Sequence, residues 1–213
     1  GQGYILEVDL EYPKHLHNKH NAYPLAPQKM KISRDMLSHF MLELLDKNDT
    51  KYSTSNEKLV PNLFDKQHYV VHYRALQTYL DLGLKLKKVH RALTFKEESW
   101  VKPYVDFNTE KRKHAKSTFE QDLFKLMLNS FFGKTMENVR KRQNVELVTD
   151  GQRFTKLVSK PTFESFKLFN TNLAGIHLRK VTVQLHKPIQ IGFSILDLSK
   201  MHTYQFHYNH ILR

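Results

Sequence analysis

Apolar and polar residues alternate in the first stretch of the chain. Between residues 4 and 12 every second residue is apolar, from Tyr4 to Tyr12, and three of the four intervening residues are acidic. Successive side chains of a strand point to opposite faces, so this period of two predicts a β-strand with one buried face and one polar face. Pro13 cannot donate a backbone hydrogen bond, and we expect the strand to end there.

Three later stretches repeat their apolar residues at helical spacing. The first covers residues 36–45, with Ser33 as a candidate N-cap. The second is a long helix over residues 109–132, with Asn108 available as its cap. The third is an amphipathic helix over residues 194–211.

Short runs rich in β-branched and aromatic residues predict further strands. Residues 46–58, rich in Asn, Thr and Ser, predict a polar loop, and Gly83 predicts the end of a short helix. Because the elements do not follow a regular βαβ order, we expect an α+β fold with small mixed or antiparallel sheets. The predicted strands cover residues 68–73, 84–95, 145–148, 178–185 and 188–193.

Composition indicates a folded and strongly basic protein. The 213 residues include 34 Lys and Arg against 21 Asp and Glu, a formal charge of +13, and 40% are hydrophobic. This charge favours a polyanionic partner such as nucleic acid, or less often an acidic membrane face. The absence of cysteine excludes disulfides, thiolate nucleophiles and cysteine-ligated zinc, and favours an intracellular location. No apolar run approaches the ~20 residues of a membrane span. The chain begins without Met, and we expect it to be a fragment of a larger protein.

The predicted long helix carries a polar row beside its apolar residues. Lys125, Asn129 and Gly133 are spaced four apart and therefore share one line of the helix. A lysine suits a phosphate, an asparagine can donate to and accept from a sugar or base edge, and a glycine lets a planar ligand approach the backbone. The row predicts a nucleotide-sized site. The adjoining apolar stripe, which can pack on a neighbour, contains Phe119, Leu123, Leu126, Met127 and the region of Phe131.

Basic residues concentrate around this helix. Residues 108–144 contain nine Lys and Arg and four Asp and Glu, a local charge of +5. Cations at the predicted helix start would add to the backbone N–H groups and dipole that already favour anions there. Residue types alone leave a second interpretation open, in which the lysines form a solvated face and Gly133 is an ordinary C′ residue. The cations at the predicted start are Lys111, Arg112, Lys113 and Lys116.

A longer linear pattern, K-x-x-x-N-S-x-[YF]-G, favours the nucleotide site. It resembles the fingers signature of family-B DNA polymerases. The strings DFNTEKRKHAK, FKLMLNSFFGKTMENVRKR and IGFSILDLSK are similar to the protein-primed (type 2) subgroup, encoded by Polinton or Maverick-like DNA transposons and related viruses. The similarity extends over nearly the whole chain and is strongest over residues 104–208. The pattern is formed by Lys125, Asn129, Ser130, Phe132 and Gly133.

The resemblance implies a DNA-directed DNA polymerase, a nucleotidyltransferase that binds primer-template DNA, deoxynucleoside triphosphates and a terminal priming protein. It implies that Lys125 holds a phosphate of the incoming nucleotide and that Lys113 reaches the other phosphates. Gly133 would leave room for the template, and Phe132 offers only stacking and shape because it lacks the hydroxyl of the Tyr in many relatives. The implied nucleotide-binding residues are Lys113, Lys125, Asn129, Ser130, Phe132 and Gly133. The implied DNA-binding residues are Lys111, Arg112, Lys116, Lys134, Arg140, Lys141, Arg142 and Lys200.

The resemblance also implies two Mg²⁺ ions held by aspartates of a D-x-x-x-L-Y-P-like motif and a D-T-D motif. Neither motif occurs in this sequence, because Asp9 and Tyr12 are three residues apart where the first motif needs five. Glu7, Asp9 and Glu11 share one strand face, where a metal site is one alternative, but we expect a solvated edge instead. We therefore predict no metal ligand in this chain and no catalysis by the chain alone.

Other candidate sites have simpler explanations. His15, His17 and His20 lie in a polar stretch without cysteine or helical ligand spacing, so we expect surface histidines and no zinc site. Asp197 has no acidic neighbour and is expected to be a helix cap or helix-start residue.

The resemblance divides the chain into four parts. Residues 1–107 would be a partial palm with an insertion that contacts the priming protein and DNA, and residues 108–143 the fingers helix. Residues 144–187 would be a second insertion, and residues 188–213 a palm strand and helix. We expect no membrane association and a nuclear location. Two alternatives remain, a non-catalytic basic nucleic-acid-binding module and a structural helical scaffold.

Overall fold

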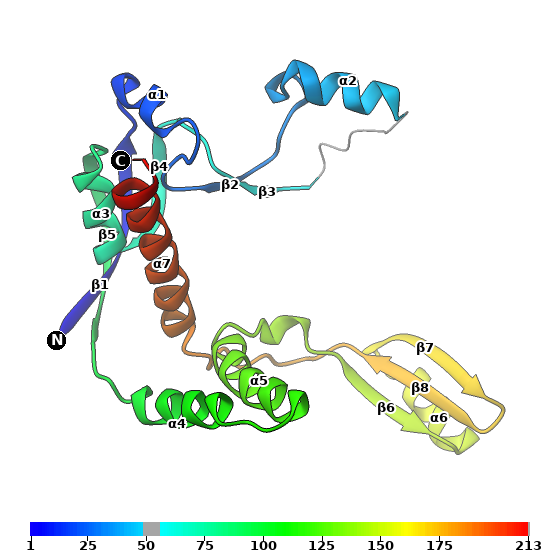
Figure 1. Cartoon of the computed structure of the whole chain (residues 1–213). Coiled ribbons are helices and arrows are strands. Elements are labelled where there is room, and N and C mark those ends of the chain that lie inside the picture. The colour runs from blue at the N-terminus through cyan, green and yellow to red at the C-terminus, as the bar shows by residue number, and fades with distance from the viewer. Residues whose placement is uncertain (49–55, 213) are drawn as a thin grey trace. The chain divides into compact units, whose positions relative to one another are not determined.

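The computed structural model describes residues 1–48 and 56–212. The chain forms two compact units, one made of residues 1–102 and 193–213 and the other of residues 103–192. Helices and small antiparallel sheets alternate along it (Figure 1). The predicted α+β class is therefore confirmed.

The first unit is built on a three-stranded antiparallel sheet in the order β4-β1-β5. Ile5 of β1 pairs with His72 on one side and Leu93 on the other, which makes β1 the central strand. The strands predicted at residues 4–12, 68–73 and 84–95 are confirmed. Their bounds are Gln2–Glu11 for β1, Lys66–His72 for β4 and Lys85–Lys96 for β5.

Two helices cover the apolar residues of this sheet. Helix α3 (Tyr73–Asp81) ends before Gly83, whose φ of 106° is a left-handed conformation that favours glycine. Helix α7 (Ile189–Phe206) continues as one π-helical segment, His207–Ile211. Burial of each large apolar side chain in their shared core contributes about 1.5–3 kcal/mol. The core includes Val8, Leu10, Val71, Tyr79, Met201, Tyr204 and Tyr208.

Helix α7 starts earlier than the sequence pattern predicts. The segment predicted as a strand, residues 188–193, belongs instead to its first turns. Pro188 precedes the helix, where proline is favoured because its missing N–H has no partner there anyway. A Cβ at Gly192 would collide with Met136 and Thr135, so glycine lets this turn approach those two residues closely.

A long excursion connects β1 to β4. It contains a short helical segment after Pro13 (Lys14–Leu16 and α1, His17–His20), a two-stranded ribbon of β2 (Gln28–Met30) and β3 (Lys58–Val60), and helix α2 (His39–Lys47).

Helix α2 begins later than predicted. Its N-cap is Ser38, which accepts a hydrogen bond from Met41 N at 3.3 Å. Ser33 precedes only a single 3-10 turn, Arg34–Met36, because the extended backbone of Leu37 interrupts the helical conformation. Of the predicted polar loop, residues 49–55 lie outside the described part of the chain, and the residues at its two ends belong to α2 and β3.

The predicted long helix of residues 109–132 is two helices, α4 (Lys102–Lys113) and α5 (Thr118–Thr135). The prediction of Asn108 as an N-cap is wrong. Asn108 is buried inside α4, and its Nδ2 donates a hydrogen bond to Tyr104 O at 2.8 Å.

A capping arrangement explains the break. Ser117 Oγ accepts a hydrogen bond from Glu120 N at 3.2 Å, and Glu120 Oε2 accepts one from Lys116 N at 2.8 Å. These bonds satisfy donors that a new helix leaves unpaired, and they fix a start at this point.

The second unit also contains a small sheet with strand order β6-β8-β7, covered on one face by α6. The strand predicted at residues 145–148 is confirmed as β6, whereas the strand predicted at 178–185 is wrong because β8 ends at Leu178. The sequence pattern predicted no strand at the position of β7. The bounds are Asn144–Val148 for β6, Gly151–Val158 for α6, Phe163–Asn170 for β7 and Leu173–Leu178 for β8.

Candidate functional site

Helix α5 presents the predicted polar row to solvent. Lys125, Asn129 and Gly133 are all exposed. Within the described residues, the Lys125 ammonium and the Asn129 amide make no hydrogen bond or ion pair. A Cβ built at Gly133 would have no neighbouring atom within 4 Å. One ammonium group, one amide and one open backbone position are thus available to a ligand.

Contacts with α4 hold α5 from another side. Tyr104 OH donates to Met127 O at 3.0 Å, and the rings of Tyr104 and Phe131 lie 5.8 Å apart. At about 100° per residue, Phe131 lies about 120° around the helix from Lys125. The row therefore stays clear of the α4 contact. The predicted apolar stripe is largely exposed, with Phe119 at 74% and Leu126 at 62% of full accessibility.

The five residues of the sequence pattern do not share one face. Phe132 is half-buried and lies about 20° from Lys125 around the helix axis, whereas Ser130 lies about 140° away. Ser130 Oγ also donates to Met127 O at 3.0 Å, one turn earlier. The structure thus brings Phe132 close to the row and directs Ser130 elsewhere.

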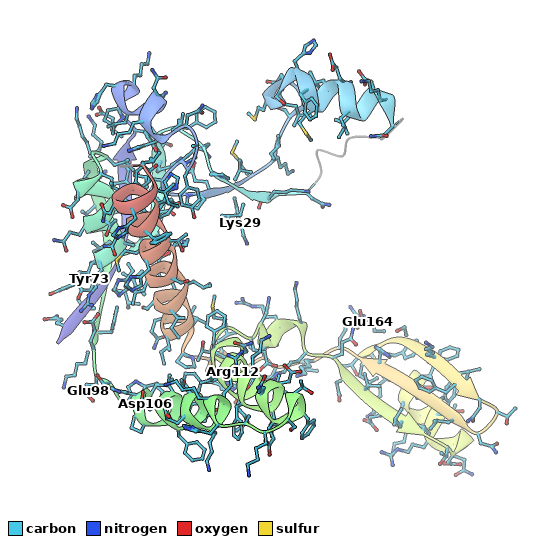
Figure 2. All side chains as sticks on the ribbon, viewed as in Figure 1. Lys29, Tyr73, Glu98, Asp106, Arg112 and Glu164 are labelled. Carbon is cyan, nitrogen blue, oxygen red and sulfur yellow. The ribbon has the colours of Figure 1, made fainter. Side chains whose placement is uncertain are left out.

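The basic residues that precede α5 lie at the C-terminal end of α4, whereas the sequence predicted that they lie at a helix start. Lys111, Arg112 and Lys113 occupy the last turn of α4, where the helix dipole favours cations and does not attract anions. Lys113 Nζ lies 2.7 Å from Glu110 Oε1, and this hydrogen bond raises the pKa of Lys113. Lys111 Nζ lies 5.7 Å from the centre of the Phe107 ring. The side chains of both helices, including the labelled Arg112, are drawn in Figure 2.

The basic residues after α5 divide into paired and unpaired groups. Glu137 forms ion pairs with Arg142 at 2.5 Å, Lys187 at 3.2 Å and Lys134 at 3.6 Å. Hydrogen bonds from Arg142 and Lys187 lower the pKa of Glu137 to about 2. Sequence reasoning missed this cluster because Lys187 is 50 residues from Glu137. Among the other implied DNA-binding residues, the side chains of Arg112 and Lys116, which precede α5, and of Arg140 and Lys141, which follow it, have no such partner in the described part of the chain.

Lys200 and Asp197 occupy successive turns of α7 in the first unit. Lys200 Nζ lies 2.6 Å from Asp197 Oδ1, while Asp197 Oδ2 accepts a hydrogen bond from His72 N at 2.8 Å. Asp197 is 2% exposed. The prediction of a helix cap is therefore wrong, and Asp197 instead anchors α7 to the junction of β4 and α3.

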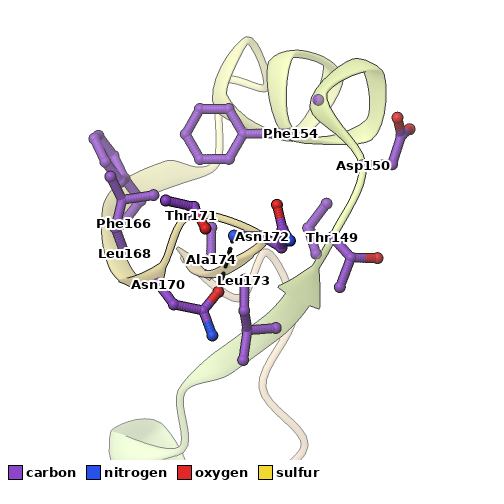
Figure 3. Close-up of a pocket in the computed structure, with 12 residues that line it drawn as sticks. Thr149, Asp150, Phe154, Phe166, Leu168, Asn170, Thr171, Asn172, Leu173 and Ala174 are labelled. Atoms are coloured by element: carbon purple, nitrogen blue, oxygen red, sulfur yellow. Dashed lines mark hydrogen bonds between the residues drawn. The ribbon is translucent and has the colours of Figure 1, made fainter.

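A cleft of about 360 Å³ opens at the tip of the small sheet (Figure 3). Phe154 and Phe166 line it with rings 5.3 Å apart, and Asn170 accepts a hydrogen bond from Asn172 N at 2.8 Å. Asp150, also in the lining, caps α6 through two backbone N–H groups. No Lys or Arg lines this cleft. It is therefore unsuited to a triphosphate.

A sequence model of the family described as DNA polymerase type B, organellar and viral, matches residues 6–211. The chain belongs to this family. No curated protein and no solved structure matches the chain. The predicted resemblance to family-B DNA polymerases is confirmed, and with it a general role in DNA synthesis from nucleotides on a DNA template.

Type B polymerases use divalent metal ions, and the carboxylates of β1 do not fit that use. Glu7 Oε2 lies 3.0 Å from Arg91 Nε, and Glu11 Oε2 lies 2.9 Å from Lys87 Nζ. Asp9 accepts a backbone hydrogen bond at 2.9 Å, which lowers its pKa. The three carboxylates face donors and not one another, so we assign no Mg²⁺ to them. They also lie on the central strand, which corrects the prediction of an edge.

One of the three histidines that we expected at the surface, His20, is buried, so that expectation is wrong for this residue. His20 is fully buried, and its Nδ1 lies 2.9 Å from Tyr12 OH, which also accepts a hydrogen bond from Leu25 N. Burial lowers the pKa of His20 to about 4. The described residues contain no helix with the length and apolar character of a membrane span.

Proposed function

We propose that the exposed row of α5 binds the incoming deoxynucleoside triphosphate during DNA synthesis. Lys125 would contact a phosphate, Asn129 the sugar or base edge, and Phe132 the nascent base pair by stacking and shape. Gly133 would let the base pair or template approach the helix backbone. Ser130 and Lys113 remain proposed contacts, although Ser130 lies on another face and Lys113 on another helix.

The state of Lys125 is the observation that supports this proposal most strongly. The side chain is exposed and unpaired among the described residues, although Asp122 lies one turn earlier on the same helix. Residues three apart are neighbours on a helix surface and can form an ion pair, but Lys125 and Asp122 do not. A free ammonium group can neutralise the charge that develops on a transferring phosphoryl group.

The surrounding charge supports a DNA contact. Residues 108–144 carry a local charge of +5. We propose that Lys111, Arg112, Lys116, Lys134, Arg140, Lys141, Arg142 and Lys200 contact the phosphates of the primer-template.

The finer assignments follow from the sequence resemblance. We propose a protein-primed polymerase of a Polinton-like transposon or related virus, acting in the nucleus with a terminal priming protein. Residues 1–107 and 188–213 would form palm, residues 108–143 fingers, and residues 144–187 an insertion. The sequence lacks both aspartate motifs, so we propose that this chain binds substrates without catalysing transfer.

Hydrogen exchange of α5 tests the nucleotide site. A deoxynucleoside triphosphate, added with Mg²⁺ and a primer-template, should slow exchange in Thr118–Thr135. Lys125→Ala should weaken this effect about tenfold or more, because it removes a charge-assisted contact. Lys156→Ala provides the matched control, since Lys156 is an exposed lysine on α6.

The outcome separates the two main functions. Equal effects of Lys125→Ala and Lys156→Ala would contradict the nucleotide site. Salt-dependent DNA binding without nucleotide protection of α5 would instead support a non-catalytic basic module.

A further inference from the structure

Three potential metal ligands converge on one face of the β4-β1-β5 sheet. Asp9 belongs to the central strand β1, His68 to β4 and His90 to β5. One ligand atom from each lies within 4.8 Å of the others. The histidines are 59 and 81 residues from Asp9 in sequence, so only the folded sheet brings the group together.

His90 is directed into the group. Its Nε2 is shielded from solvent and lies 2.8 Å from Asp9 Oδ2, but the two atoms are not aligned for a hydrogen bond. The rings of His68 and His90 are stacked 4.1 Å apart with an interplanar angle of 22°. An imidazole nitrogen and a carboxylate oxygen placed in this way can both be satisfied by one cation.

Glu7 supports the group from one side. Its Oε1 lies 2.7 Å from His68 Nδ1, while its Oε2 lies 3.0 Å from Arg91 Nε. With Nδ1 held by a carboxylate, Nε2 of the same ring is the nitrogen available to a metal. A carboxylate on the other ring nitrogen is the usual outer partner of a metal-bound histidine, which it orients and makes more basic.

We propose that Asp9, His68 and His90 bind one zinc-like divalent transition-metal ion. Two imidazoles and one carboxylate suit zinc or cobalt, whereas magnesium prefers oxygen ligands alone. The three protein ligands leave a position for water. The ion would link the three strands of the sheet and stabilise the folded state by binding it preferentially. This site is separate from α5 and does not depend on the proposed nucleotide function.

Cobalt(II) provides the direct test because its visible absorption reports ligand number and geometry. The chain, prepared without a histidine tag, should bind one equivalent of Co²⁺ that Zn²⁺ displaces and excess Mg²⁺ does not. His68→Asn should weaken binding at least about tenfold. This variant preserves the fold, because the His68 side chain is 64% exposed and asparagine tolerates its positive φ of 51°.

Two further variants complete the test. Asp9→Asn removes the carboxylate ligand, and Glu7→Gln should weaken binding about tenfold through the orientation of His68. His114→Gln is the control, because His114 also lies beside a carboxylate, 3.7 Å from Glu110, but belongs to no group of three potential metal ligands among the described residues. The proposal is overturned if the original chain does not bind Co²⁺ or if His68→Asn leaves the Co²⁺ affinity unchanged. It is also overturned if His114→Gln lowers the Co²⁺ affinity as much as His68→Asn does.

Discussion

Replacing Gly133 with alanine should stabilise α5 and weaken nucleotide binding at the same time. Gly133 is a helical, exposed residue whose added Cβ would meet no atom within 4 Å. Alanine is favoured over glycine inside a helix by about 1 kcal/mol, since it loses less backbone entropy on folding. We therefore expect amides of α5 to exchange about fivefold more slowly in Gly133→Ala without ligand.

The functional effect should have the opposite sign. If the open position at Gly133 admits a base pair or template strand, the new methyl group occupies that space. Nucleotide-dependent protection of α5 should then require a higher concentration in Gly133→Ala than in the original chain. Both quantities come from the same hydrogen-exchange experiment, with and without the nucleotide and primer-template.

Gly192→Ala is the matched glycine control. Its Cβ would clash with Met136 and Thr135, and overpacking of this kind costs about 1–3 kcal/mol. Gly192→Ala should therefore speed exchange around Gly192 and the C-terminal end of α5. If Gly133→Ala leaves nucleotide protection unchanged, the close-approach role of Gly133 is refuted. If Gly133→Ala instead destabilises α5, then the space around Gly133 is not open as the structure indicates.

Two further predictions concern the first unit. Burial holds the pKa of His20 at about 4, against 6.5 for an ordinary histidine, so the unfolded chain binds a proton that the folded chain excludes between these values. The free energy of unfolding should thus fall by about 3 kcal/mol as the pH drops from 6.5 to 4, and His20→Gln should flatten this dependence in denaturant titrations. Asp197→Ala should cost about 2–3 kcal/mol in the same assay because it leaves His72 N buried without its charged acceptor. Lys200→Ala, which removes only the partly exposed ion-pair partner, should cost below about 1 kcal/mol, and equal losses would show that the ion pair and not the backbone anchor dominates.

Local periodicity was sufficient to predict the strands of the first sheet. In β1 the alternation is clear because one face packs in a core and the other meets solvent, and Val8 and Leu10 are accordingly buried. The same reasoning failed at the α4–α5 break, because residues 114–117 contain no glycine or proline that would indicate an interruption of the helix. The signal that was available there is the spacing of Ser117 and Glu120, which is typical of a capping box.

Contacts between distant segments could not be predicted from one sequence. Asp197 accepts a hydrogen bond from the backbone of His72, 125 residues away. His20 is hydrogen-bonded to the Tyr12 hydroxyl, which also accepts a hydrogen bond from Leu25 N. The sequence identifies the side chains of Asp197 and His20 as polar, but it contains no signal that they are buried. The same limit applies to the Asp9, His68 and His90 group, whose members lie on three strands.

The row of Lys125, Asn129 and Gly133 on α5 could be predicted because it depends only on helical spacing. Which lysines and arginines are free of ion pairs could not be predicted, because the pairing depends on the folded structure. Lys113, Arg142 and Lys200 each lie within 2.7 Å of a carboxylate oxygen. An anionic ligand must compete with those acids, whereas Lys125 has no such ion pair in the described chain even with Asp122 nearby. The formal charge therefore overstates the number of free cations, and Lys125 can engage a phosphate without first losing a protein partner.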